Sequence, residues 1–352
     1  MTNSKAHVFL ASTPLHLLQA LAITDVHQLN DAHLLMIDQD SALKTPYFTQ
    51  LTQWSNNPFA SMHQFFRPPR QPLRKWQARQ ATFRELKHIA KHIRPKAIYG
   101  GNDRRIEFQY LMHTASEMNL MPRGIYLDDG LFTYAGRQAS FSINDRFIDH
   151  AIKKLVYGFW WKHPKTVGAS DWITDGYVAF PDLAHPLLQS KHLKPLTAKY
   201  WQCPSVTSFC QQLIDQAAAQ IDFSQFDAVI TLPHESILNQ QPRYRDKLIK
   251  IIEHWRQQNG TVAIKSHPRN KVLDPLNTAD MGATVLSQRL PFEAMLPLLA
   301  SRVSVYGDLS TTLLITRLLK PEASVYALFS DTNTRMASIY QQLGILVWPC
   351  VS

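Results

Sequence analysis

The sequence has little that points to a membrane-spanning, disulfide-bonded or metal-binding protein. No apolar run approaches the roughly 18–20 residues that a transmembrane helix needs. The only cysteines are Cys203, Cys210 and Cys350, which are too few for a disulfide framework and have no plausible metal-ligating partners nearby. We expect them to be buried free thiols. The 12 glycines are too few for a collagen-like chain or a flexible linker.

The remaining composition is that of a globular protein. Hydrophobic residues make up 45% of the chain and charged residues 18%, which excludes a disordered or fibrous protein. A length of 352 residues indicates about two domains, at roughly 150 residues per domain. Pro14, His16 and Gln19 interrupt the apolar stretch 7–23, so a first strand and helix explain it better than a signal peptide. We therefore expect a cytoplasmic protein.

One segment carries almost all of the positive charge. The formal net charge is +10, and residues 67–96 hold ten basic residues against one acid, Glu85, which amounts to +9. Residues Trp76–Ile93 of this segment are predicted to be a helix, with Phe83 and Leu86 available for packing. A basic helix favours an anionic neighbour such as nucleic acid, acidic lipid headgroups or a phosphorylated glycolipid. A simple solvated helix face explains the charge equally well.

Short apolar strands alternate with helices in both halves of the chain. This alternation predicts an α/β fold with parallel sheets covered by helices on both faces. Residues 157–200 lack clean periodicity and suit a segment that crosses between domains, so we expect domains at 1–170 and 171–352. Neither a GxGxxG nor a GxxxxGK[ST] motif is present. The predicted strands are 7–12, 32–37, 97–100, 124–127, 227–232, 260–265, 302–306 and 324–328.

Four clusters of polar residues follow predicted strands or begin helices, where α/β folds bind ligands. Asp128-Asp129-Gly130 ends the strand 124–127. Adjacent side chains of a strand point to opposite faces, so one carboxylate can face a ligand as a general base while the other anchors the loop. An Asp-Gly turn with a helix cap is the structural alternative.

The second cluster is Lys265-Ser266-His267-Pro268-Arg269. Three potential cations directly after a strand suit a phosphate group, and a cationic His267 would assist a leaving phosphate. A basic surface turn is the alternative.

The third cluster, Gly307–Thr312, opens a helix with small hydroxyl residues that cap it or bind an anion. The fourth, Pro291-Phe292-Glu293, places one carboxylate where it caps a helix or binds both hydroxyls of a ribose. Together the clusters suit transfer of a nucleotide-activated sugar to a hydroxyl acceptor.

These clusters resemble the motifs of bacterial sialyltransferases of the two-domain nucleotide-sugar type, including the lipooligosaccharide sialyltransferases. Those families share a D/E-D/E-G, a His-Pro and a Ser-Ser/Thr motif in this order. Here the motifs are Asp128-Asp129-Gly130, His267-Pro268 and Ser310-Thr311. The Pro-Phe-Glu segment and the opening Ser12–Ala20 are also similar to theirs.

The resemblance implies two Rossmann-like domains that face each other across a cleft, the GT-B fold, with the acceptor bound by the first domain and the donor by the second. It implies that Asp128 is the general base and that Asp129 and Gly130 shape the loop. His267 would stabilise or protonate the leaving phosphate, and Ser310 and Thr311 would hydrogen-bond it. The remaining implied donor-binding residues are Lys265, Pro268, Arg269, Phe292 and Glu293; Asn102, Asp103, Arg104, Arg105 and Thr13 are our acceptor candidates.

The implied reaction is an inverting, metal-independent transfer of sialic acid, or a related nonulosonic acid, from a CMP-activated donor. The acceptor would be a glycan hydroxyl such as a terminal galactose of lipooligosaccharide or capsule. No cofactor and no nucleic acid partner are expected, and residues 67–96 would contact an anionic membrane at its inner face. Three alternatives remain open: a CDP-glycerol or polyol-phosphate transferase, a CMP-Kdo transferase, and a non-catalytic protein that binds anionic polymers.

Overall fold

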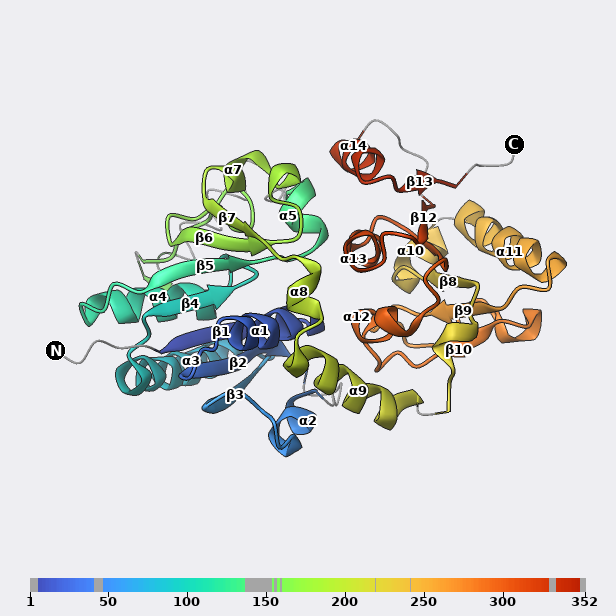
Figure 1. Cartoon of the computed structure of the whole chain (residues 1–352). Coiled ribbons are helices and arrows are strands. Elements are labelled where there is room, and N and C mark those ends of the chain that lie inside the picture. The colour runs from blue at the N-terminus through green and yellow to red at the C-terminus, as the bar shows by residue number, and fades with distance from the viewer. Residues whose placement is uncertain are drawn as a thin grey trace. The chain divides into compact units, whose positions relative to one another are not determined.

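The computed structural model describes residues 6–40, 47–136, 154, 157–158, 160–218, 220–240, 242–328 and 334–348. The chain divides into two compact units, Met1–Val206 and Thr207–Ser352 (Figure 1). The boundary that we expected at residue 170 is wrong. Residues 157–200 contain two strands that extend the sheet of the first unit, so the first unit continues to Val206.

The first unit is built on a seven-stranded sheet with the order β3-β2-β1-β4-β5-β6-β7, in which all neighbouring strands are parallel. The central strands are short and almost fully buried, as expected for strands covered on both faces. The strands are β1 (His7–Ala11), β2 (Ala32–Gln39), β3 (Ser61–Phe66), β4 (Ala97–Gly100), β5 (Arg123–Leu127), β6 (Ile173–Val178) and β7 (His192–Pro195).

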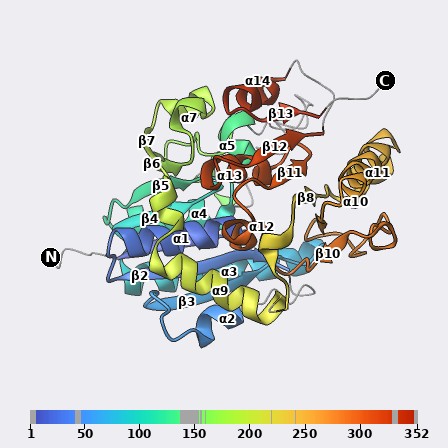
Figure 2. The ribbon, with the colours of Figure 1, turned by 45° about the vertical axis from the view of Figure 1, so that its right-hand side comes forward.

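Helices cover the first sheet. The basic segment forms α3 (Pro72–Ile93), which packs with α4 (Ile106–Glu117) over the apolar side chains of β1 and β2. Helix α1 (Pro14–Val26) lies in front of the strands in Figure 2 and contacts α8 (Ala198–Trp201). Thr13 caps α1 by accepting a hydrogen bond from the His16 backbone N–H. The shorter helices of this unit are α2 (Tyr47–Gln53), α5 (Leu131–Ala135) and α7 (Pro186–Gln189), and α9 (Pro204–Ala218) leads into the second unit.

The second unit is built on a six-stranded parallel sheet with the order β10-β9-β8-β11-β12-β13. The apolar side of α11 (Pro242–Gln257) packs on β8 and β9, and α13 (Thr311–Leu319) packs on β11 and β12. Its strands are β8 (Ala228–Thr231), β9 (Val262–Lys265), β10 (Thr284–Leu286), β11 (Ser304–Gly307), β12 (Ser324–Ala327) and β13 (Leu346–Val347), and its other helices are α10 (Glu235–Gln240), α12 (Phe292–Met295) and α14 (Arg335–Gln342).

Both sheets have the strand order of a Rossmann-like fold, so the α/β prediction is confirmed. In each sheet the order reverses once, between β1 and β4 in the first unit and between β8 and β11 in the second. Ligands of such sheets bind outside the carboxyl ends of the strands at this reversal. The sequence clusters that lie near these two reversal points are therefore the candidate ligand-binding residues.

Every strand predicted from the sequence is present, whereas β3, β6, β7, β10 and β13 were not predicted. The helix expected at 291–299 consists of the short α12 followed by a 3-10 turn at Leu296–Leu298. Cys203 and Cys210 are buried free thiols, as predicted, and Cys350 lies outside the described residues. None of the helices within the described ranges is long and apolar enough to span a membrane.

Candidate active site

The first acidic residue of the Asp-Asp-Gly cluster anchors its loop. Asp128 is only 2% exposed, and its carboxylate accepts four hydrogen bonds. Oδ1 accepts from the Gly130 N–H and the Thr133 hydroxyl, both at 2.8 Å. Oδ2 accepts from the Tyr134 hydroxyl at 2.6 Å and the Ala179 N–H at 2.8 Å. Burial raises the pKa of Asp128, and these hydrogen bonds oppose the rise.

The second acidic residue is the accessible one. Asp129 has 14% of its side chain exposed, and its Oδ1 lies 3.1 Å from His16 Nε2. In the described part of the chain no hydrogen bond to its other oxygen is present. Our expectation gave Asp128 the free carboxylate and Asp129 the loop-shaping role; the hydrogen bonds reverse the two. Gly130 does shape the turn, because its φ of 68° is a conformation that favours glycine.

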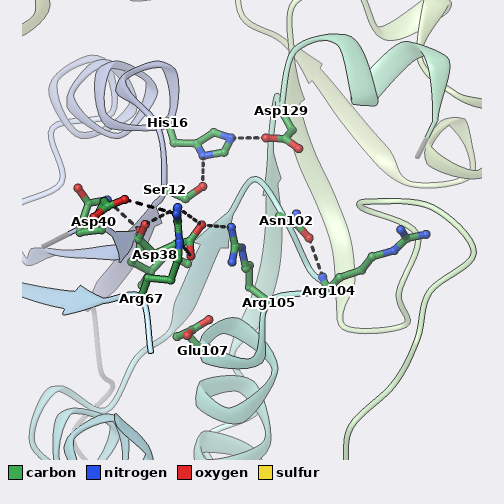
Figure 3. Close-up of polar contacts among 12 residues, drawn as sticks. Ser12, His16, Asp38, Asp40, Arg67, Asn102, Arg104, Arg105, Glu107 and Asp129 are labelled. Atoms are coloured by element: carbon green, nitrogen blue, oxygen red, sulfur yellow. Dashed lines mark hydrogen bonds and ion pairs between the residues drawn. The ribbon is translucent and has the colours of Figure 1, made fainter. Parts of the chain in front are cut away.

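His16 joins Asp129 to the loop after β1. Its ring lies between Ser12 and Asp129 in Figure 3, with Nδ1 3.2 Å from the Ser12 hydroxyl. Three residues further along α1, Gln19 donates a hydrogen bond of 2.8 Å to the Asp128 carbonyl. Helix α1 therefore contacts both acidic residues of the β5 loop, at the reversal point of the first sheet.

Two arginines meet one carboxylate at the same edge of the sheet. Asp38, near the end of β2, accepts hydrogen bonds from Arg67 and Arg105 (Figure 3). Burial by itself raises the pKa of Asp38, but the contacts with the two arginines outweigh burial and lower this pKa below its ordinary value. Arg105 remains 32% exposed and Arg67 45% exposed, and Arg67 Nη1 also lies 3.6 Å from the Asp40 carboxylate.

The five acceptor candidates do not behave alike. Asp103 is fully buried and accepts hydrogen bonds from the Gly168 and Ser170 N–H groups, both at 2.8 Å, so it holds the fold and is not an acceptor ligand. Arg104 donates to the carbonyls of Pro164 and Lys165 and holds the same segment. The assignment of Asp103 is therefore wrong, whereas that of Arg104, which is partly exposed, stays a prediction.

The other three acceptor candidates keep accessible side chains at the carboxyl edge of the first sheet. Thr13 caps α1, and Asn102 accepts from the Arg104 N–H at 3.0 Å. Both side chains are at least partly exposed, as is that of Arg105.

His267 follows β9 in the second unit and is neutral near pH 7. Burial lowers its pKa to about 4, assisted by the nearby His234, Arg269 and Lys265. Nδ1 accepts a hydrogen bond of 3.1 Å from the Arg269 N–H, which leaves the proton of the neutral ring on Nε2. His234 follows β8, and the centroid of its ring lies 5.5 Å from that of the His267 ring, edge to face. The cationic state that we expected for His267 concerns the ring beside a bound phosphate, and it stays a prediction.

The other predicted donor residues differ in accessibility. Lys265 is 5% exposed, and burial lowers its pKa to about 8 although Glu293 opposes the shift. Burial raises the pKa of Glu293, with Lys265 opposing. Phe292 is a core side chain at 4% exposure, so it does not line an open site. Pro268 and Arg269 are exposed on the loop after β9.

Hydroxyl groups gather at the reversal point of the second sheet. Ser310 directly precedes α13. Its hydroxyl lies 2.6 Å from that of Thr312, which is 3.3 Å from the Thr231 hydroxyl at the end of β8. Thr311 is the first residue of the helix and is partly exposed. A Cβ on Gly307 would lie 2.4 Å from the Thr231 Oγ1, so this close approach of β11 to β8 requires glycine.

Several site residues were missed in the sequence. They include His16, His234, Thr231 and Asn270, whose amide binds the Glu235 N–H and the Pro233 carbonyl and so joins the loops after β8 and β9. Thr231 lies near the end of the predicted strand 227–232 and His234 follows that strand, so their place at a strand end could have indicated a ligand-binding role. His16 gave none, because a histidine in an apolar helix is usually a core residue.

No group of three or more His, Cys, Asp or Glu side chains in the described ranges is arranged to hold a metal ion.

A family model described as alpha-2,8-polysialyltransferase matches residues 7–328. A comparison with curated protein sequences returned no significant match.

Solved structures share the fold. The alpha/beta-galactoside alpha-2,3-sialyltransferase of Photobacterium phosphoreum has a TM-score of 0.55 at 12% identity, over 97% of this chain and 98% of its own. The UDP-GlcNAc 2-epimerase of Methanocaldococcus jannaschii has a TM-score of 0.56 at 11% identity, over 97% and 88%. That of Neisseria meningitidis has a TM-score of 0.56 at 11% identity, over 97% and 87%. At such identities these likenesses concern the two-domain fold alone.

Proposed function

Because this chain belongs to the alpha-2,8-polysialyltransferase family, we propose that it transfers sialic acid from a CMP-activated donor to a hydroxyl of a sialylated glycan. Membership makes the chain a glycosyltransferase and, more narrowly, a sialyltransferase. The family match over residues 7–328 is the observation that carries the proposal. The narrower assignment to the lipooligosaccharide branch stays a prediction.

Asp129 is the proposed general base. It is the acidic residue of the β5 loop with an oxygen that has room for another partner, whereas both Asp128 oxygens are fully engaged. In the proposed step the acceptor O–H gives its proton to Asp129 as its oxygen bonds the anomeric carbon of the donor. The bond from that carbon to the phosphate oxygen breaks, CMP leaves, and one displacement inverts the anomeric centre.

The second unit is proposed to receive the leaving phosphate. A neutral His267 donates its Nε2–H, and the Ser310 hydroxyl and the N-terminus of α13 add further donors. Negative charge grows on the phosphate as the bond breaks, so these donors stabilise the transition state more than the bound donor. Bound phosphate would also raise the pKa of His267 and favour proton transfer from it. Glu293 is the proposed ribose ligand.

An anionic acceptor is the finer part of the proposal. The family description names an alpha-2,8 linkage, in which the acceptor itself ends in sialic acid. The half-exposed Arg67 and Arg105 lie at the edge of the sheet that also carries Asp129 (Figure 3). Their remaining N–H groups suit the acceptor carboxylate, because guanidinium groups bind carboxylates through paired hydrogen bonds.

Product analysis tests the donor and the acceptor together. The purified protein is incubated with CMP-sialic acid alone, with lactose, with sialyllactose or with oligosialic acid, and CMP and product masses are measured. Extension of sialyllactose or oligosialic acid, but not lactose, is expected. Transfer to lactose only would overturn the anionic acceptor. If no CMP is released from CMP-sialic acid but glycerol phosphate is transferred from CDP-glycerol, the sialyltransferase assignment fails.

The N-terminal part of α3 is proposed to contact an anionic membrane. Nine of the ten basic residues of 67–96 are exposed, and Arg79 instead pairs with Glu107. Phe66, Leu73 and Trp76 are 53%, 69% and 52% exposed among these basic side chains. Exposed apolar and basic residues on one helix end suit the interface of acidic lipids.

Sedimentation with lipid vesicles tests this contact. We expect binding to vesicles that contain phosphatidylglycerol but not to phosphatidylcholine vesicles, and a loss of binding in L73S/W76S. Met121→Ser removes a similarly exposed apolar side chain elsewhere in the first unit and is the matched control. Equal binding by L73S/W76S and M121S would refute the membrane contact.

A further inference from the structure

We propose that His16 is a positioning residue that orients the Asp129 carboxylate for proton abstraction from the acceptor. This inference rests on the proposed function, since it assigns a role within that reaction. It is carried by a chain of contacts at the reversal point of the first sheet. Ser12, from the loop after β1, contacts one ring nitrogen of His16, and Asp129, from the loop after β5, lies beside the other (Figure 3).

The His16 ring is buried with an unfulfilled nitrogen. The residue is 1% exposed, and Nε2 makes no well-aligned hydrogen bond although Asp129 Oδ1 is only 3.1 Å away. An unsatisfied buried donor is unfavourable, so a rearrangement of the Asp129 side chain that aligns this contact is favourable. The two atoms are therefore close enough for a hydrogen bond, although their alignment in the structure does not make one.

Gly101 shows that the ring position is closely defined. Gly101 follows β4, and a Cβ at this residue would lie 1.9 Å from His16 Nε2. The imidazole therefore fills the space that any larger residue at position 101 would need. Gln19 holds the same loop from the next turn of α1 through the Asp128 carbonyl. Two side chains of α1 thus fix the backbone and the carboxylate of the base loop.

One tautomer of His16 suits both contacts. With the Ser12 hydroxyl as the donor to Nδ1, the ring proton lies on Nε2, the nitrogen that is 3.1 Å from Asp129 Oδ1. Oδ1 is then held by His16, and Oδ2 receives the proton of the acceptor hydroxyl as the new glycosidic bond forms and CMP leaves. His16 keeps its own proton throughout, so its role is to hold the geometry of the base.

The experiment compares three variants with the wild type. His16→Leu removes the donor, and His16→Gln keeps an amide N–H near the position of Nε2. His33→Gln is the matched control, because His33 is a buried histidine that likewise contacts an aspartate, Asp31, and a serine, Ser61. His33 lies near the start of β2, at the end of the sheet away from Asp129. Rates and KM for CMP-sialic acid and sialyllactose are measured, with urea unfolding of each variant.

We expect H16L to lower kcat by about 100-fold, the loss typical of a misplaced catalytic group, with little change in either KM. H16Q should recover most of kcat, and H33Q should keep the wild-type rate even if it is less stable. The inference is overturned if H16L, shown to be folded, keeps a wild-type kcat, or if H16Q is as inactive as H16L. An H33Q variant that loses as much kcat as H16L also overturns it. A wild-type protein that never turns over CMP-sialic acid instead refutes the proposed function, and the inference falls with it.

Discussion

Replacing Asp128 by asparagine should lower the stability of the first unit more than its activity, whereas replacing Asp129 by asparagine should lower activity more than stability. In Asp128→Asn the amide oxygen keeps two of the four donors, and the new NH₂ group faces the other two. Two hydrogen bonds to a charged group are lost, each contributing roughly 1.5–3 kcal/mol, so the first unit should lose about 3–6 kcal/mol of unfolding free energy. In Asp129→Asn no comparable network is broken, and the expected loss is below about 1 kcal/mol.

Activity should follow the reverse order. Loss of a general base lowers the rate by roughly 10²–10⁴-fold, so D129N should be folded but nearly inactive with sialyllactose as acceptor. D128N should retain measurable kcat at a temperature where its first unit is still folded. Urea denaturation followed by circular dichroism and CMP release on the same samples give both quantities. A folded, active D129N together with a folded, inactive D128N would refute our assignment and return the base to Asp128.

Three further predictions concern the second unit and the requirement for metal. The pKa of His267 is lowered from 6.5 to about 4, so the unfolded chain binds more protons between these values. The unfolding free energy of the second unit should therefore fall as the pH drops from about 6.5 toward 4. His267→Asn should flatten this part of the profile, and an unchanged profile would contradict the burial of a neutral imidazole. Gly307→Ala should destabilise the second unit by about 1–3 kcal/mol because its Cβ would meet Thr231 Oγ1. Adding Thr231→Ala should recover part of that loss in urea denaturation, and fully additive losses would count against the contact. Finally, EDTA should leave CMP release unchanged, and a chelator-sensitive rate that metal ions restore would show that the reaction needs a metal.

The alternation of short apolar strands with helices was enough to predict the two parallel sheets. Strands such as β1 and β8 are short apolar runs that only a doubly covered sheet buries, so local sequence determines them. The strands β6 and β7 were missed because Asp175 and the exposed residues of β7 break that pattern at the edge of the sheet. For the same reason the domain boundary was placed too early.

The carboxyl ends of the predicted strands also indicated where the Asp-Asp-Gly, His-Pro and Ser-Thr clusters lie. Sequence alone, however, left open which of two adjacent carboxylates is free. Three of the four groups that bind Asp128 lie within six residues of it, but the Ala179 N–H comes from 51 residues away, and His16 lies more than 100 residues before Asp129. Local patterns specify strands and turns, whereas hydrogen bonds between distant segments exist only after the sheet has formed. The tertiary structure therefore decided that Asp128 holds the loop and that Asp129 keeps an available oxygen.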